Sequence, residues 1–145
     1  MHLQSANAYA NGVGSGQKAV MWFDAPYDSN YDTVSYASCS LTLTMSKTDF
    51  EPAPAGTISV KADVGADNIT AQYTNNSRIQ LDSLNTFCLF YDASGKLITA
   101  KERYAECKQP SSVDFVTYDF PYDDDYKTIK PATYKLYYWG FSYNL

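Results

Sequence analysis

Acidic and amide side chains gather in two short segments whose spacing comes closest to that of an ion-binding loop. Ca²⁺ takes about six to eight hard oxygen ligands, and carboxylates at alternate positions supply several of them. Thr33 stands where an EF-hand loop requires glycine, and no terminal Glu follows, so the competing interpretation is a solvated turn in which Asp binds its own backbone. The candidate calcium ligands are Asp28, Asn30 and Asp32 in the first segment, and Asp119, Asp123 and Asp125 in the second.

Catalytic chemistry finds little support in the remaining residue types. His2 is the only histidine, which removes nucleophile systems built on a Ser-His or Cys-His pair inside the fold and all multi-histidine metal sites. Gly12, Gly14 and Gly16 match neither the dinucleotide-binding nor the P-loop spacing. Most acidic residues cluster in turns rather than as a pair facing a cleft. We therefore expect that the protein is not an enzyme and that it needs no cofactor other than the candidate calcium.

The cysteines offer no metal-binding spacing. Cys39, Cys88 and Cys107 form no C-x-x-C motif, and their odd number leaves at least one thiol free or paired between chains. The simplest interpretation is that all three are small apolar residues of strands or core. A bridge between Cys88 and Cys107 is the alternative.

Charge and hydropathy exclude two classes of partner. The chain of 145 residues carries a net charge of −5, and an acidic chain repels phosphate backbones, so no nucleic acid partner is expected. No apolar run reaches the roughly 20 residues that span a bilayer, so we expect no membrane insertion. The N-terminal segment is polar and shows no signal peptide. Tyrosine is abundant, with 14 copies, which favours strands over helices.

An internal repeat organises the chain. Residues 9–47 align without a gap on residues 104–142, and 10 of the 39 positions are identical, where average composition gives about two or three. The shared segment reads D-x-P-Y-D-x-x-Y-x-T, which is typical of a turn between two strands. The repeat of about 95 residues has the size of one immunoglobulin-like sandwich. We assign residues 1–50 to the C-terminal half of a preceding repeat, packed on or completing a neighbouring sheet, and residues 51–145 to a complete module.

Alternating polar and apolar positions predict strands throughout, and no stretch keeps a helical period. The fold class expected is therefore an all-β, antiparallel sandwich of the Ig-like or fibronectin-like kind with a partial internal repeat. The segment 47–56, rich in proline, is expected to be a linker, and Gly95 to close a hairpin turn at positive φ. The predicted strands are 18–23, 35–45, 57–64, 69–74, 83–91, 96–104, 113–120 and 133–143.

The middle of the chain resembles the FxLYD-type domains of Gram-positive secreted proteins. The resemblance runs from Ile69 to Phe120, about half the chain, and depends on Asn75-Asn76-Ser77, Phe87-x-Leu89-Phe90-Tyr91-Asp92 and Ser94-Gly95-Lys96-Leu97, followed by Tyr104. It implies an Ig-like extracellular module, often found in multidomain bacterial envelope proteins, without catalytic residues. The acidic Asp-Pro-Tyr-Asp loop lies outside that pattern.

An aromatic stripe distinguishes the second copy of the repeat from the first. In the first copy, the apolar positions Cys39, Leu41, Leu43 and Met45 should face a core. The same phase in the second copy directs Tyr134, Leu136 and Tyr138 inward. The outward positions are then Tyr137, Trp139, Phe141 and Tyr143, and an exposed aromatic patch of this kind marks an interface.

Three interpretations of this stripe remain open at the sequence level. Residues 1–50 cover it within the chain, another module or a second chain docks on it, or sugar rings stack on it. We expect a non-catalytic structural or adhesive module of a tandem-repeat cell-envelope or secreted protein, whose partners are other domains of the same protein or a second chain. The alternative is a carbohydrate-binding module that uses the aromatic strand face to bind a glycan.

Overall fold

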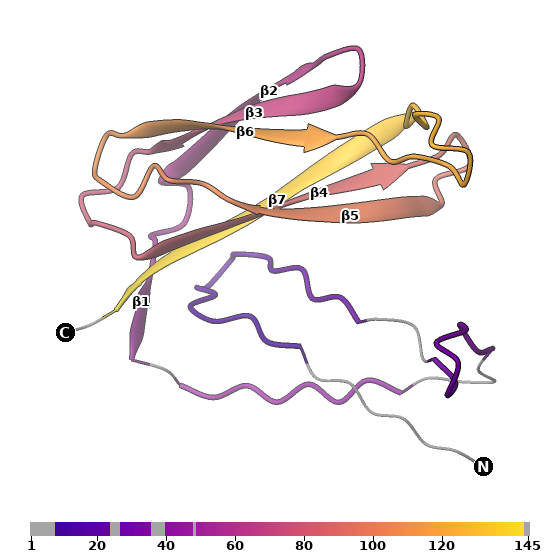
Figure 1. Cartoon of the computed structure of the whole chain (residues 1–145). Helices are drawn as coiled ribbons and strands as arrows, with labels where there is room; N and C mark the ends of the chain where they lie inside the picture. Colours follow the sequence, from indigo (N-terminus) through magenta and orange to yellow (C-terminus); the bar gives the residue numbers. More distant parts are fainter. Residues whose placement is uncertain (1–7, 24–26, 36–39, 48, 144–145) are drawn as a thin grey trace.

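The computed structural model describes residues 8–23, 27–35, 40–47 and 49–143. All the regular structure in these residues is β-strand (Figure 1). The strands are β1 (Phe50–Pro52), β2 (Ile58–Val64), β3 (Asn68–Asn75), β4 (Ser83–Tyr91), β5 (Leu97–Tyr104), β6 (Val113–Asp119) and β7 (Thr133–Tyr143).

Two antiparallel sheets pack face to face as a sandwich (Figure 1). The larger sheet has the order β1-β7-β4-β5, and the smaller sheet has the order β2-β3-β6. β4 is the centre of the larger sheet, because it pairs along its length with both β5 and β7. β1 pairs only with the last residues of β7, from Phe141 to Tyr143.

The core lies between the sheets and follows directly from the alternation of side chains along the strands. Ile69, Ala71 and Tyr73 of β3 point inward, and every second residue of β3 is buried. Phe90 of β4 meets Phe120, with ring centroids 5.8 Å apart in an edge arrangement. These contacts make residues 50–143 a sandwich with its own core.

Two buried tyrosines bring polar groups into that core without leaving them unpaired. The hydroxyl groups of Tyr73 on β3 and Tyr118 on β6 are 2.9 Å apart and hydrogen bond to each other. Burial raises the pKa of both phenols above the ordinary range, so both stay neutral. Within the described residues, no buried side-chain polar atom lacks a partner.

The all-β sandwich and most strand positions agree with the sequence predictions. The predicted strands from residue 57 onward are confirmed, with small shifts at their ends. Gly95 has a φ of 83°, as expected for the hairpin turn between β4 and β5. The linker prediction for residues 47–56 is wrong in part, because Phe50–Pro52 forms the edge strand β1, where a proline lacking an N–H is tolerated.

The two predicted N-terminal strands are not strands in the described residues. Residues 18–23 and 40–45 form no strand and pair with no neighbouring strand among the described residues. The core-facing prediction for the second segment is therefore wrong within this chain: Leu41 is 71 % exposed, Leu43 61 % and Met45 87 %. Cys39, which is predicted with them, lies outside the described residues, as does His2.

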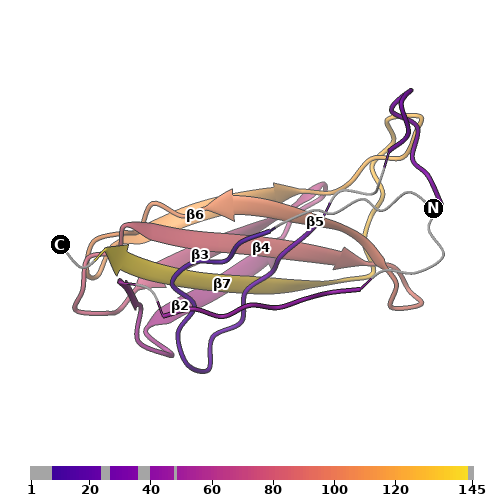
Figure 2. The same ribbon diagram turned by 90° about the horizontal axis from the view of Figure 1, so that it is seen from below.

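Three turns share one backbone arrangement. In each, the Oδ1 atom of an aspartate accepts two backbone N–H groups, from the residues two and four positions later. In each, the aspartate N–H donates to the carbonyl of that fourth residue, which closes the turn. The three aspartates are Asp28, Asp92 and Asp123. The turns of Asp28 and Asp123 project from the same end of the molecule (Figures 1 and 2).

Candidate functional site

The outer face of the larger sheet carries a cluster of aromatic side chains. Phe87 of β4 and Trp139 of β7 stack with ring centroids 5.6 Å apart and planes 10° from parallel. The register explains the contact, because Phe87 lies opposite Tyr137 and Asn85 lies opposite Trp139. This set of Phe87, Trp139 and Phe141 is called the aromatic face below.

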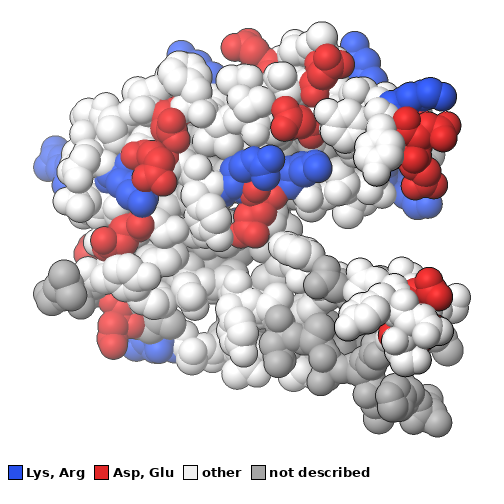
Figure 3. Space-filling model, in the orientation of Figure 1, with Lys and Arg blue, Asp and Glu red and all other residues white. Residues whose placement is uncertain are grey.

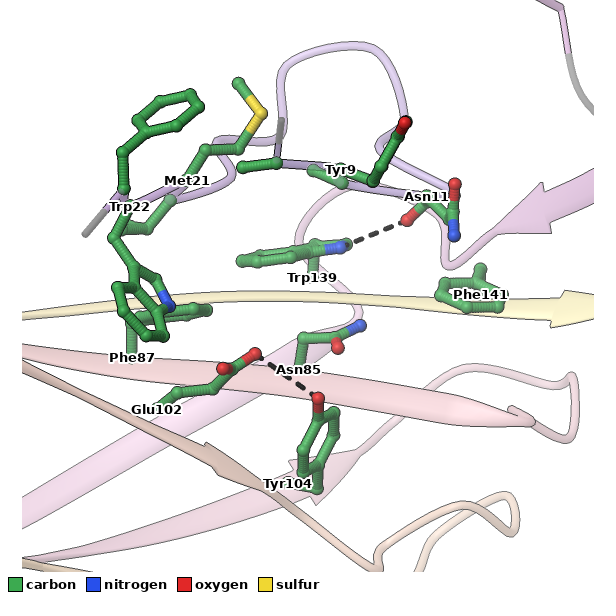
Figure 4. Close-up of a pocket in the computed structure, with 14 residues that line it drawn as sticks. Tyr9, Asn11, Met21, Trp22, Asn85, Phe87, Glu102, Tyr104, Trp139 and Phe141 are labelled. Atoms are coloured by element: carbon green, nitrogen blue, oxygen red, sulfur yellow. Dashed lines mark hydrogen bonds between the residues drawn. The ribbon is translucent and has the colours of Figure 1, made fainter. Parts of the chain in front are cut away.

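The N-terminal segment, residues 8–23, lies across the aromatic face (Figure 4). The indole Nε1–H of Trp139 donates to the carbonyl of Asn11 at 3.1 Å. Gly12 has a φ of 64° and rests on Phe141, so closely that a Cβ at this position would collide with the ring. As a result Trp139 is only 4 % exposed and Phe141 6 %.

Gln17 fixes the middle of the same segment to the sandwich. Its side-chain Nε2 donates to the carbonyl of Ala53 at 2.8 Å, while its Oε1 accepts the backbone N–H of Gly14 at 2.8 Å. Ala53 follows β1 directly, so the segment is held next to the chain that leads into the sandwich. Two hydrogen bonds to the sandwich and the contact with Phe141 therefore hold the cover in place.

A cleft of about 490 Å³ remains between the N-terminal segment and the sheet. Figure 3 shows the two parts diverging toward one end of the molecule. Trp22 points from the segment toward Phe87, and Glu102 and Tyr104 of β5 line the opposite wall (Figure 4). The Tyr104 hydroxyl donates to Glu102 Oε1 at 3.3 Å. Burial, and then the charge of Glu102, raise the pKa of Tyr104, so this wall presents a neutral phenol beside Glu102.

The structure separates the four predicted surface residues into two kinds. Trp139 and Phe141 are covered, whereas Tyr137 is half-buried and Tyr143 is exposed. Tyr143 packs on the edge of both Phe50 and Phe141, with centroids 5.1 and 5.6 Å away. The inward prediction for Tyr134, Leu136 and Tyr138 is confirmed, because all three pack against the core.

Sequence reasoning missed two contributors to the site. Phe87 belongs to the aromatic face although the family resemblance made it only a motif residue. The alternation of β4, in which Leu84, Thr86, Cys88 and Phe90 are buried inward, already placed Phe87 on the outer face. The Asn11 carbonyl had no sequence signal, because a backbone acceptor is available at any residue.

Backbone hydrogen bonds explain why aspartate occupies the acidic turns. Asp28 and Asp123 each accept two backbone N–H groups, and Lys127 lies 3.5 Å from Asp125 as an exposed ion pair. In the part of the chain that the structure describes, no group of three or more His, Cys, Asp or Glu is arranged to hold a metal ion. Asn30, Asp32 and Asp119 are exposed and contribute to no such group.

The two described cysteines are buried free thiols. Cys88 and Cys107 form no bridge, so the alternative of a disulfide between them is wrong. Burial raises the pKa of the Cys88 thiol to about 12, and it also raises the pKa of Cys107. Both are therefore small apolar core residues, as the simpler sequence interpretation held.

Comparisons with known proteins return no relative. No family model matches the chain, and no match was found among the curated proteins or the solved structures. Within the described residues, no helix is long and apolar enough to cross a membrane.

Proposed function

We propose that the chain is a non-catalytic structural or adhesive module of a secreted or cell-surface tandem-repeat protein. Its aromatic face is the surface on which the neighbouring module docks. The observation that carries the proposal is the cover on Trp139 and Phe141, which comes from residues 8–23. By the repeat, these residues belong to the end of a preceding module rather than to the sandwich of residues 50–143.

The turn geometry supports the repeat on which this proposal depends. Tyr27 and Thr33 form an isolated bridge, and Tyr122 and Thr128 form the same bridge 95 positions later. Tyr31 and Tyr126 take the left-handed conformation at equivalent positions, with φ of 66° and 61°. Most residues avoid this backbone conformation. Finding it at equivalent positions of both copies is therefore a stronger sign of common architecture than composition alone.

The FxLYD-type resemblance adds the expected location. Modules of that kind belong to Gram-positive secreted and envelope proteins, and the two-sheet antiparallel sandwich is consistent with the Ig-like fold that the resemblance implies. A secreted location and an Ig-like topology are accordingly part of the proposal.

Truncation tests the assignment of modules. A chain that begins at Asp49 should still fold and unfold cooperatively, because the core lies within residues 50–143, with a midpoint lowered only by the lost docking of residues 8–23. Trp139 should become accessible to acrylamide in this chain, compared with a full-length Trp22→Phe variant in which Trp139 is the only tryptophan. An unfolded truncated chain would disprove the module boundary, and an unchanged quenching rate would disprove the cover.

A second candidate function is carbohydrate binding in the cleft. The observation in its favour is the pairing of exposed aromatic rings, Trp22 and Tyr104, with the polar groups of Asn85 and Glu102. Sugar rings stack on aromatic faces while their hydroxyls bind such polar groups. In a glycan array, Tyr104→Ala should lower the affinity of any bound glycan about tenfold or more, whereas Tyr143→Ala, outside the cleft, should not. Equal binding by both variants would exclude the cleft.

A further inference from the structure

We infer that residues 18–23 and 40–47 are the last two strands of a second sandwich, and that their partner is a set of strands of the same kind as β1 to β5. The inference rests on the repeat that the proposed function invokes. It goes further by naming the kind of partner that these residues bind.

The repeat register gives the first segment an apolar face. A shift of 95 places residues 18–23 on β6. Val116 and Tyr118 of β6 are buried in the core, and their counterparts are Met21 and Phe23. The counterparts are large and apolar, as a core position requires.

The second segment has the same property at every core position. Residues 40–47 correspond to β7, where Leu136 and Tyr138 pack against the core. Gly140 lies so close to Leu81 and Leu84 that a Cβ there would crowd both, so the strands that receive Met45 must be smaller at these two positions. In the segment the counterparts of the three β7 residues are large and apolar, and the positions between them hold Ser or Thr. The apolar residues are Leu41, Leu43 and Met45. Strict alternation of this kind is typical of a strand with one buried face.

Nothing in the described chain buries this face. All of residues 40–47 are exposed, and the segment runs below residues 8–23, away from the sandwich (Figure 1). The visible surface of the N-terminal segment is also poor in charge, unlike the sandwich above it (Figure 3). Contiguous exposed apolar surface on a soluble chain marks an interaction site.

The two faces of the first segment serve different purposes. Trp22 points toward the aromatic face, whereas Met21 points away from it (Figure 4). Docking on the sandwich of residues 50–143 therefore uses Trp22, while Met21 is half-buried beside the cleft and Phe23 remains exposed. The chain contacts its own module and completes another at the same time.

The chain itself shows what the partner must offer. β6 pairs with β3 and β7 pairs with β4, so the partner needs one strand edge in each of two sheets. It also needs inward apolar side chains like those of Ile69, Ala71 and Phe90. Residues 50–103 of this sequence contain both strands, and cores accept substituted apolar side chains when total volume and pattern are kept.

The test adds the missing strands to the full chain. Residues 50–103 are duplicated in place of residues 1–8, so that the added copy leads into Tyr9, which corresponds to Tyr104. The substitution Met45→Gly is made in the extended and the unextended chain, to match Gly140 and avoid Leu81 and Leu84 of the added copy. Hydrogen exchange of residues 18–23 and 40–47 should slow by about a hundredfold or more relative to the unextended chain, because their amides enter sheets. Binding of a dye that reports exposed apolar surface should fall.

A matched control carries Leu41→Asp and Leu43→Asp in the same extended chain. It should lose the added protection and keep the protection of β3 and β4 in the original sandwich. An extended chain whose residues 40–47 exchange as fast as before, with dye binding unchanged, would overturn the inference. So would protection of these residues in the unextended chain that grows with its concentration, because the partner would then be a second copy.

This result is separable from the test of the proposed function. The truncated chain tests whether residues 8–23 shield Trp139 from acrylamide, which concerns the docking face. The extended chain tests the apolar face of residues 18–23 and 40–47, which points away from the docking face. Slow exchange of residues 40–47 in the extended chain, together with a quenching rate of Trp139 that is the same in the truncated and the full-length chain, would support the strand partner and reject the docking interface.

Discussion

At the scale of single residues, the three aspartate turns share their hydrogen bonds but differ at the left-handed position. Gly95 fills it in one turn, while Tyr31 and Tyr126 fill it in the other two, where they are 86 % and 88 % exposed. A bulky side chain at positive φ is strained, because its Cβ crowds the neighbouring carbonyl. The Asp side chain, which satisfies two N–H groups in each turn, is what holds the strained tyrosine in place.

Tyr126→Gly should raise the free energy of unfolding by about 1 kcal/mol, because glycine takes this conformation without the Cβ penalty. Urea denaturation of the full chain measures the change. Gly95→Ala is the matched control, because a Cβ there meets no atom within 4 Å. This variant should lower the free energy of unfolding by about 1 kcal/mol through backbone strain alone. A less stable Tyr126→Gly variant would show that the phenol ring contributes packing.

Asp92 makes the β4–β5 turn sensitive to acid. The hydrogen bond from the Ser94 side chain, then that from the Lys96 backbone, lower the pKa of Asp92. A lowered folded-state pKa means that the carboxylate stabilises the fold above about pH 4, its unfolded pKa, and that this contribution is lost as pH falls through the folded pKa.

Asp92→Asn should keep the acceptor and remove the titration. Urea unfolding above and below about pH 4 should therefore show a smaller loss of stability on acidification in the variant than in the parent chain. An equal loss in both chains would show that other carboxylates carry the acid sensitivity.

At the scale of elements, the fit between the N-terminal segment and β7 depends on one residue without a side chain. Gly12 lies against Phe141, while Trp139 donates to the neighbouring Asn11 carbonyl. Close approach of backbone to ring is what lets a short segment exclude water from two aromatic side chains without a β-ladder.

Gly12→Ala should release the segment from the aromatic face. We expect exchange of residues 8–23 to accelerate about tenfold, the equivalent of about 1.4 kcal/mol, and Trp139 in a Trp22→Phe background to become accessible to acrylamide. The free energy of unfolding of the sandwich should fall by no more than this amount, because the segment stabilises the folded sandwich only by docking on it. Gly16→Ala is the matched control, because Gly16 also has a positive φ, 76°, but a Cβ there meets nothing within 4 Å. It should therefore leave Trp139 covered. Equal effects of both variants would point to the backbone rather than to Phe141.

At the scale of the whole molecule, the sandwich was largely predictable and its cover was not. Alternation of β3 and β7 fixed their inward residues, and Gly95 with Asp92 marked the hairpin, because these signals act between near neighbours. The phase of β7 also placed Trp139 outward. Its burial could not be predicted, because it depends on a segment more than 100 positions away that binds through a backbone carbonyl and a glycine.

The buried thiols report whether the sandwich opens as a unit. In a Cys39→Ser variant, Cys88 and Cys107 should react with a thiol reagent about a thousandfold or more slowly in the folded chain than in urea. Both thiols are buried, and burial raises their pKa, so the reagent reaches them only after the sandwich unfolds. Fast labelling of either residue in the absence of urea would contradict a closed core. Equal slow rates for both would indicate a single cooperative opening.

The exposed alternation of residues 40–46 has a consequence for the chain in concentrated solution. Ser-Leu-Thr-Leu-Thr-Met-Ser contains no charge, no proline and no glycine, which is the composition of segments that stack in register into cross-β fibrils. The side-chain pattern that suits a sandwich partner suits copies of itself equally well. We therefore expect the chain to form fibrils, with their growth monitored by thioflavin fluorescence, and we expect Leu43→Lys to suppress that growth. A strand partner that covers this segment would then also prevent self-assembly.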